Sequence, residues 1–144
     1  MIDNKKLILD ICNISIRAGN KTLEYYKDDI EVTHKNDSSP LTKADLASNK
    51  IIKNALHNLD TTIPILSEES LVDWNTRKSW NKYWLVDPLD GTKEFIKKNG
   101  EFTINIALIE KNSPILGVIF APAKSVIYFA QKGYGSFTID TNEE

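Results

Sequence analysis

Residues 84–95 read WLVDPLDGTKEF, and in this stretch an apolar run ends in two carboxylates. Asp87 follows the run directly, and the proline after it restricts Asp87 to an extended backbone. Asp90 and Gly91 then follow in an order typical of a tight turn over residues 88–91. Such a turn would direct Asp87, Asp90 and the Leu89 carbonyl toward one point. Because ionised carboxylates that lie so close repel one another unless a cation intervenes, the stretch predicts a strand that ends in a cation site.

A second carboxylate pair follows another apolar segment, residues 63–66, which is continued by the sequence SEES. If the two apolar segments are parallel strands, Glu68 and Asp87 reach the same edge of the sheet. SEES alone equally fits a serine cap with two acidic residues in the first turn of a helix, and this alternative stays open.

A further carboxylate, Asp45, lies in the segment SPLTKAD. Thr42 is expected to cap a helix, and Asp45 three positions later completes a capping box. Asp45 also stands seven residues before Ile52, which places it on the inward stripe of that helix. As a first-turn acid it is equally explained by the helix dipole. The rest of the stripe consists of Ser48, Ala55, Leu56 and Leu59.

The composition narrows the class of protein. A chain of 144 residues with 41% hydrophobic and 26% charged residues suits one compact domain. A net charge of −2 favours a small phosphorylated partner over nucleic acid. Cys12 is the only cysteine, so an internal disulfide is excluded. We find no signal peptide and no window near the about 20 apolar residues of a membrane span. We expect a cytoplasmic protein, with peripheral association with the inner membrane left open.

The hydrophobic patterns predict an α+β fold in which two helices cover a mainly antiparallel sheet. The sequence KNDSSP, residues 35–40, is expected to be a loop, as are residues 73–81 with two tryptophans. KNSP and PAKS are expected to connect hairpins. Helices are expected at residues 7–26 and from Thr42 to 59, and strands at 30–34, 63–66, 83–86, 103–109, 115–121 and 126–130.

The chemistry of these groups points to phosphate-ester hydrolysis. An all-oxygen ligand set favours Mg²⁺, Mn²⁺ or Ca²⁺ over zinc, and two histidines with one cysteine make a structural zinc site improbable. Gly91 lets a substrate approach the backbone, whose N–H groups hold anions. Thr92, linked to Asp45, would orient or deprotonate a water for two-metal hydrolysis. A solvated turn is the alternative for DPLDGT.

The order SPLTKAD, ILSEES, WLVDPLDGT resembles the inositol monophosphatase-like, metal-dependent and lithium-sensitive phosphatases. That family has an acidic pair followed by D-P-x-D-G-T, here Glu68-Glu69 and residues 87–92. The run GTKEFIKKNGEFTINIALIE, residues 91–110, is similar to the bacterial CysQ branch. That branch consists of 3'(2'),5'-bisphosphate nucleotidases, which convert adenosine 3',5'-bisphosphate to AMP and phosphate.

The resemblance implies a metal site of two or more Mg²⁺ ions. Glu68, Asp87 and the Leu89 carbonyl would ligate the first ion. Asp87 would bridge to a second ion, which Asp90 also binds. Glu69 matches the second acid of the family's pair, and its role stays open.

The resemblance also implies catalytic and substrate-binding roles. Asp45 and Thr92 would be catalytic, because they would position the attacking water. The amides of Gly91 and Thr92 would hold the phosphate. The substrate-binding surface implied in this way comprises Glu68, Leu89, Asp90, Gly91 and Thr92.

This sequence departs from the family pattern in one respect. The resemblance implies that residues 1–144 form a sugar-phosphatase-like N-terminal domain without the family's C-terminal α/β domain. That second domain carries a W-D-x-A/G motif, which does not occur here, and its aspartate completes the second metal site. We therefore expect a partner in the form of a second copy of the chain or of a missing C-terminal domain.

Three other functions remain as alternatives. Haloacid-dehalogenase-type phosphatases also end a strand in aspartates, but as D-x-D-G-T, with a nucleophilic first aspartate. An inositol monophosphatase or sugar bisphosphatase would share the family and differ in substrate. A non-catalytic fragment would only bind metal or pair with another subunit.

Overall fold

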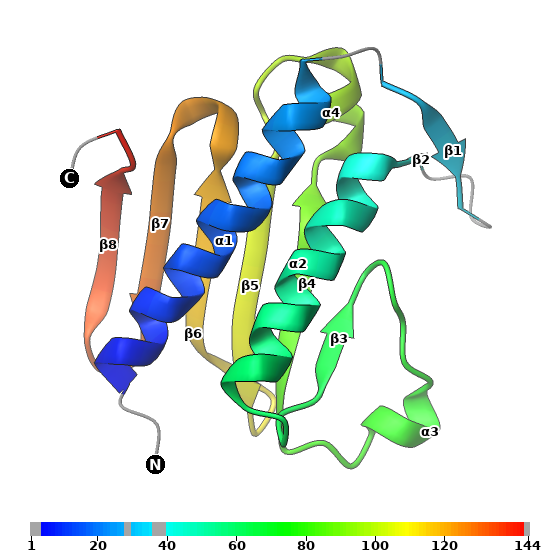
Figure 1. The fold of residues 1–144 in the computed structure, drawn as a ribbon. Helices are drawn as coiled ribbons and strands as arrows, with labels where there is room; N and C mark the ends of the chain where they lie inside the picture. Colours follow the sequence, from blue (N-terminus) through cyan, green and yellow to red (C-terminus); the bar gives the residue numbers. More distant parts are fainter. Residues whose placement is uncertain (1–3, 28–29, 36–39, 143–144) are drawn as a thin grey trace.

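The computed structural model describes residues 4–27, 30–35 and 40–142, and these residues form a mixed α+β fold. Two long helices, α1 (Asn4–Tyr26) and α2 (Lys43–Leu59), lie side by side across one face of a six-stranded sheet, as Figure 1 shows. The strand order is β3-β4-β5-β6-β7-β8. Only the β3–β4 pair is parallel, and the other pairs of this sheet are antiparallel. The predicted fold class is therefore confirmed.

The sheet contains β3 (Ile65–Ser67), β4 (Lys82–Asp90), β5 (Thr103–Glu110), β6 (Ser113–Ala121), β7 (Val126–Gln131) and β8 (Gly135–Asp140). Beside it, β1 (Val32–His34) and β2 (Pro40–Thr42) form a separate two-stranded pair. Three short helices complete the described elements: α3 (Trp74–Arg77), α4 (Thr92–Lys97) and a 3₁₀ turn (Pro122–Lys124).

The core lies between the helices and the sheet. Apolar residues spaced by three and four positions put Ile11 of α1 and Ile52 of α2 fully out of contact with water. On the sheet side, alternate residues of β5 face the helices, as Ile104 and Ile106 do. Burying one such side chain contributes about 1.5–3 kcal/mol. This core holds the sheet edge from which the carboxylates project.

The opposite face of the sheet has no helix over it in the described part of the chain (Figure 1). It forms a groove of about 860 Å³ along β3 to β8. Large apolar side chains are half exposed there, among them Ile119 at 45%, Tyr128 at 48% and Phe137 at 52%. Glu68, Asp87 and Asn105 line the same groove.

Several local predictions are confirmed. Thr42 caps α2, and Asp45 completes the capping box. Lys111 and Asn112 of KNSP have φ of 51° and 66°, and they connect the antiparallel strands β5 and β6. PAKS likewise joins β6 to β7. Of the predicted loop KNDSSP, residues 36–39 lie outside the described residues, and Pro40 belongs to β2.

Other local predictions are wrong. Pro88 and its neighbours do not form a tight turn, because β4 continues to Asp90 through a register shift. The alternative of a serine-capped helix at SEES is also wrong, since Ser67 ends β3 and the two glutamates lie in a turn. The helices α3 and α4 are too short for a helical period to mark them, and β8 lies beyond the last predicted strand. No described helix is long and apolar enough to cross a membrane.

Candidate active site

The parallel pairing of β3 and β4 brings two of the predicted carboxylates to one edge. Ser67 lies opposite Val86 in the last pair of the register, so Glu68 and Asp87 follow directly where β3 ends and its pairing with β4 stops. The Glu68 backbone N–H donates to the Val86 carbonyl at 3.1 Å, which holds the two ends together. The geometry predicted for these two residues is confirmed.

A β-bulge shapes the segment between the two aspartates. Asp87 pairs with Asn105 and Asp90 pairs with Thr103, so two residues of β4 face one residue of β5. Pro88 lies in this bulge, where a residue has no partner in the ladder, so its missing N–H costs no hydrogen bond between the strands. The bulge shifts the register after Asp87 without ending β4, and Asp90 is exposed at the end of the strand.

Gly91 joins the bulge to α4. Its φ of 88° and ψ of 44° place it in the left-handed region, which glycine adopts without a steric cost. A Cβ at this position would lie 2.9 Å from the Glu101 carbonyl oxygen. Phe95 attaches α4 to the core, because its ring is fully buried and its centroid lies 4.9 Å from that of the Phe102 ring. Glycine is therefore required for the chain to enter α4 at Thr92.

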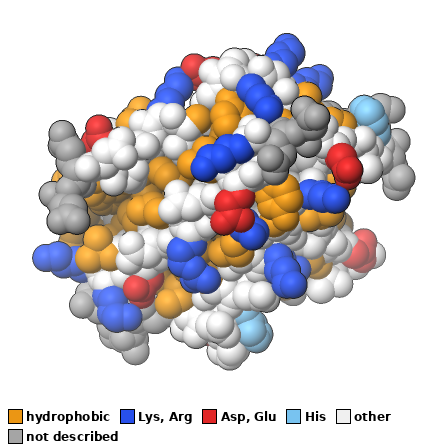
Figure 2. Space-filling view, turned by 45° about the horizontal axis from the view of Figure 1, so that its top comes forward, with side chains coloured by type: hydrophobic (Ala, Val, Ile, Leu, Met, Phe, Trp, Pro, Cys, Tyr) orange, Lys and Arg blue, Asp and Glu red, His pale blue; other side chains and the backbone are white. Residues whose placement is uncertain are grey.

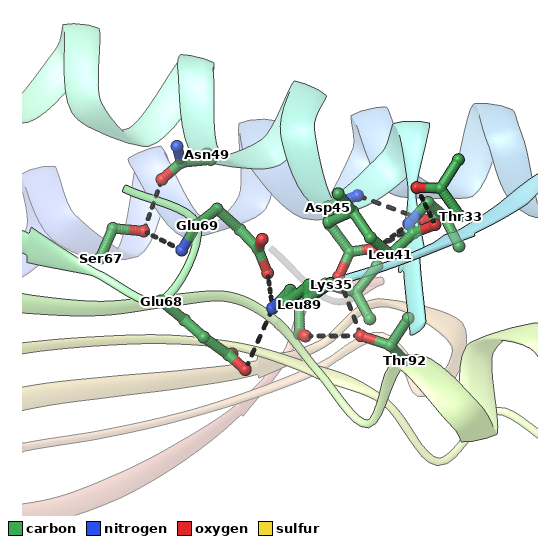
Figure 3. A network of polar contacts seen from close by, with 11 residues as sticks. Thr33, Lys35, Leu41, Asp45, Asn49, Ser67, Glu68, Glu69, Leu89 and Thr92 are labelled. Atoms are coloured by element: carbon green, nitrogen blue, oxygen red, sulfur yellow. Dashed lines mark hydrogen bonds and ion pairs between the residues drawn. The ribbon is translucent and has the colours of Figure 1, made fainter. Parts of the chain in front are cut away.

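Asp45 and Thr92 form a direct contact, which Figure 3 shows between the starts of α2 and α4. The Thr92 hydroxyl donates to Asp45 Oδ1 at 2.8 Å. Asp45 Oδ2 accepts from the Thr42 backbone N–H at 3.0 Å and from its hydroxyl at 2.5 Å. Asp45 is fully buried, as its place on the inward stripe predicts. It serves both as a cap and as the partner of Thr92.

The electrostatics concentrate on Asp87. Burial raises the pKa of its carboxyl group from 3.8 to about 8, and the neighbouring carboxylates of Glu68 and Asp90 add to the effect. The Leu89 backbone N–H donates to Asp87 and opposes the shift. Within the described residues, Asp87 Oδ1 is buried without a hydrogen-bond partner. Crowded carboxylates with an unsatisfied oxygen are the environment in which a divalent cation is favourable.

Lys35 is a member of the site that the sequence did not identify. As Figure 3 shows, its ammonium group lies between the two glutamates that follow β3. The Nζ atom is 2.8 Å from Glu69 Oε1 and 3.4 Å from Glu68 Oε1. Burial disfavours the ammonium ion, but the two carboxylates outweigh it and raise the pKa of Lys35. Burial raises the pKa of Glu69, and the ion pair with Lys35 opposes that shift.

Two polar residues of α2 tie the strand ends to that helix. The buried Ser48 hydroxyl donates to the Pro88 carbonyl at 2.6 Å. The Ser67 hydroxyl donates to Asn49 Oδ1 at 2.6 Å and accepts from the Glu69 backbone N–H at 3.3 Å. Ser48 could have been found, because it is a polar residue on an otherwise apolar stripe. Asn49 and Lys35 do not interrupt an apolar pattern, so nothing in the sequence marks them as members of the site.

The predicted ligands are brought together only in part. Glu68 and Asp87 face each other, while Asp90 lies farther along the bulge and accepts from Asn105 Nδ2 at 3.0 Å. Among the described residues no group of three or more His, Cys, Asp or Glu side chains is arranged to hold a metal. The oxygen donors present nevertheless fit a hard divalent cation at the Glu68–Asp87 position, since carboxylates are its preferred ligands. The Leu89 carbonyl is close by and accepts weakly from Thr92 at 3.4 Å.

One face of the molecule, seen in Figure 2 with the top of Figure 1 turned forward, carries charges of both signs. In Figure 2, lysine and arginine side chains are scattered around a central acidic group, with apolar side chains between them. The basic side chains do not form one continuous stripe on this face. A small anionic ligand fits such a mixed surface better than a long polyanion does.

Comparison with known proteins agrees with this geometry. Residues 3–143 match the sequence profile of the inositol monophosphatase family. The chain is 47% identical over 129 residues to the 3'(2'),5'-bisphosphate nucleotidase CysQ of Salmonella typhimurium, which covers 88% of this chain and 52% of that protein. The CysQ of Buchnera aphidicola is 49% identical over 128 residues, or 88% of this chain and 48% of that protein.

Solved structures agree as well. The crystal structure of CysQ from Bacteroides thetaiotaomicron, described as a bacterial member of the inositol monophosphatase family, superposes with a TM-score of 0.81 at 41% identity. The match covers 95% of this chain and 50% of that one. The chain thus spans about half the length of the curated relatives it matches.

Proposed function

The chain belongs to the inositol monophosphatase family, and we propose that it forms the metal-binding half of a Mg²⁺-dependent phosphomonoesterase. The proposed reaction takes adenosine 3',5'-bisphosphate to AMP and phosphate. The observation that carries the proposal is the pairing of Glu68 with Asp87, whose Oδ1 is buried without a partner among the described residues. Family membership also sets aside the haloacid-dehalogenase alternative, and with it a nucleophilic Asp87.

Glu68, Asp87 and the Leu89 carbonyl are proposed to hold a first Mg²⁺, and Asp87 and Asp90 a second. Bound Mg²⁺ neutralises phosphate charge and makes a water molecule more acidic. The chain's own part is to hold the carboxylates aligned at the sheet edge, where a bound cation would favour their ionised form. Lys35 lies closer to Glu69, at 2.8 Å, than to Glu68, at 3.4 Å, so a cation at Glu68 would compete with the weaker of the two ion pairs.

Thr92 and Asp45 are proposed to position the attacking water. Because the Thr92 hydroxyl donates its proton to Asp45, the Thr92 oxygen is free to accept a hydrogen bond from a water. A proton removed from that water can pass through the hydroxyl to the Asp45 carboxylate, which the α2 cap holds in place. General-base assistance of this kind contributes about 10²–10⁴ in rate.

The phosphate is proposed to lie against the backbone N–H groups of Gly91 and Thr92. The left-handed φ of 88° at Gly91 sets the direction of these two N–H groups where β4 passes into α4. Glu68, Leu89 and Asp90 complete the proposed substrate surface around this position.

Full activity is proposed to require the sequence that corresponds to the other half of the relatives. The chain matches 52% and 48% of the two CysQ proteins, so about half of each relative lies outside the matched region. A second candidate function, a metal-binding or subunit-pairing role without turnover, is favoured by the incomplete gathering of Glu68, Asp87 and Asp90.

The test is Mg²⁺-dependent phosphate release from adenosine 3',5'-bisphosphate by this chain, with Asp87→Asn as the control. Release that disappears in the variant would support catalysis by this half alone. A folded chain that binds Mg²⁺ without release would favour the second candidate. Faster turnover of an inositol phosphate would assign the chain to another substrate class of the same family.

A further inference from the structure

Asn105 lies on β5 directly opposite Asp87. Its side-chain Nδ2 donates to Asp90 Oδ2 at 3.0 Å, so it contacts one aspartate of the bulge and pairs across the strands with the other. The amide has to be oriented in this way, because the reversed orientation would bring two oxygen atoms together. The bond therefore fixes both the Asn105 side chain and the Asp90 carboxylate.

The other end of the same amide is unsatisfied. Within the described residues, Asn105 Oδ1 is buried without a hydrogen-bond partner, as is Asp87 Oδ1 on the neighbouring strand. Both residues line the groove together with Glu68. Buried acceptors without donors are costly, and such groups in a native fold usually indicate a ligand or an ordered water. The hydration shell of a bound cation would supply the missing donors.

Asp90 is in particular need of a positioning partner. It is exposed at the end of β4, and the bulge separates it from the regular ladder that aligns Asp87. A free carboxylate there would sample several rotamers, and only some of them would point toward Asp87.

We propose that Asn105 is a positioning residue that holds the Asp90 carboxylate toward the second metal position. This inference rests on the proposed metal-dependent function. Partners that orient a metal ligand in this way change metal affinity or activity by about 10–100-fold when they are removed. Asn105 acts through Asp90 and does not touch the reacting atoms.

The test is titration of the metal-free chain with Mn²⁺ by calorimetry. We expect Asn105→Leu to weaken Mn²⁺ binding by at least about 10-fold. The matched control is Asn99→Leu, because Asn99 Nδ2 also donates to a carboxylate, that of Glu94, outside the groove. Circular dichroism checks the fold, and Asn105→Ala, which adds no volume, replaces the leucine variant if that variant does not fold.

A double-mutant cycle separates positioning from a general structural role. In an Asp90→Ala background, Asn105→Leu should cause no further loss of Mn²⁺ affinity, because the carboxylate that it holds is absent. An equal loss in both backgrounds would overturn the inference. Wild-type affinity in Asn105→Leu would overturn it while leaving the proposed function intact. A wild-type chain that binds no Mn²⁺ would overturn the proposed metal site, and this inference with it.

Discussion

The pKa of Asp87 leads to a prediction about pH. Burial first, and then the Glu68 carboxylate, raises this pKa from 3.8 to about 8. The folded state thus binds the proton more tightly than the unfolded state does. The free energy of unfolding of the metal-free protein should therefore fall as pH rises from about 4 to about 8, by up to about 1.4 kcal/mol per pH unit. Urea unfolding at pH 5, 6, 7 and 8 measures the slope.

Asp87→Asn provides the control for this slope, because the amide has nearly the same shape and no charge to bury. The variant should be more stable than the wild type at pH 8 and should lose the pH dependence. It should also lose any stabilisation by Mg²⁺. Parallel pH profiles for the two proteins would contradict the assignment of the titration to Asp87.

Thr92 leads to a prediction about catalysis. Thr92→Val keeps the shape of the side chain and removes the hydroxyl that donates to Asp45. In the preparation that releases phosphate, kcat should fall by about 10²-fold or more with little change in KM, because the hydroxyl acts on the water and not on substrate binding. Thr33→Val is the matched control, since the Thr33 hydroxyl bonds to the Leu41 carbonyl on an exposed strand. A rise in KM alone would contradict the proposed role.

The sequence predicts the positions of some of these residues, because those positions depend on nearby residues in the chain. Asp45 is found by its distance of seven residues from Ile52, since helical periodicity fixes the face on which it lies. Lys35 is not found, because its contact with Glu69 depends on how β1 and β3 are placed in space. No spacing within the chain encodes a contact between residues so far apart in sequence.

At the scale of elements, Gly91 decides how β4 passes into α4. We expect Gly91→Ala to destabilise the fold, because alanine would be strained at a φ of 88° and its Cβ would meet the Glu101 carbonyl at 2.9 Å. Gly133 is the matched control, since it has a φ of 86° and a Cβ added there would meet nothing within 4 Å. Both variants carry the backbone strain, and only Gly91→Ala should carry about 1–3 kcal/mol more from the clash. Equal losses in chemical denaturation would show that the clash is relieved elsewhere.

The elements differ in how well the sequence predicts them. The long helices and the strands of the sheet follow from repeated apolar positions, which average over many residues. The sequence after Asp87 predicts a turn where the structure has a bulge, because proline, aspartate and glycine favour both. Cross-strand pairing with β5 decides between the two, and that pairing is not visible in β4 alone.

At the scale of the whole molecule, the sequence predicts that helices cover the sheet but not that both cover the same face. The strands are also apolar at most positions, so their sequences do not alternate between apolar and polar residues and do not show which face is buried. In β6, Leu116, Val118 and Phe120 are buried under the helices, while Ile119 faces the groove. A strand that is apolar on both sides is typical of a sheet buried on both sides. Within residues 4–27, 30–35 and 40–142, no helix covers the apolar side chains of this second face.

This face leads to the last prediction, which concerns association. Contiguous exposed apolar surface promotes binding to other apolar surfaces, so the chain should bind a hydrophobic dye and self-associate as its concentration rises. Ile119→Glu should reduce both effects, because it places a charge in the groove at a side chain that is already 45% exposed. Leu46→Glu is the matched control, since Leu46 is 49% exposed on α2, which packs on the other face. Sedimentation velocity over a range of concentrations measures association. A monomer at all concentrations would mean that the groove side chains repack against one another in solution, and a loss of association in Leu46→Glu would place the contact on the helices instead.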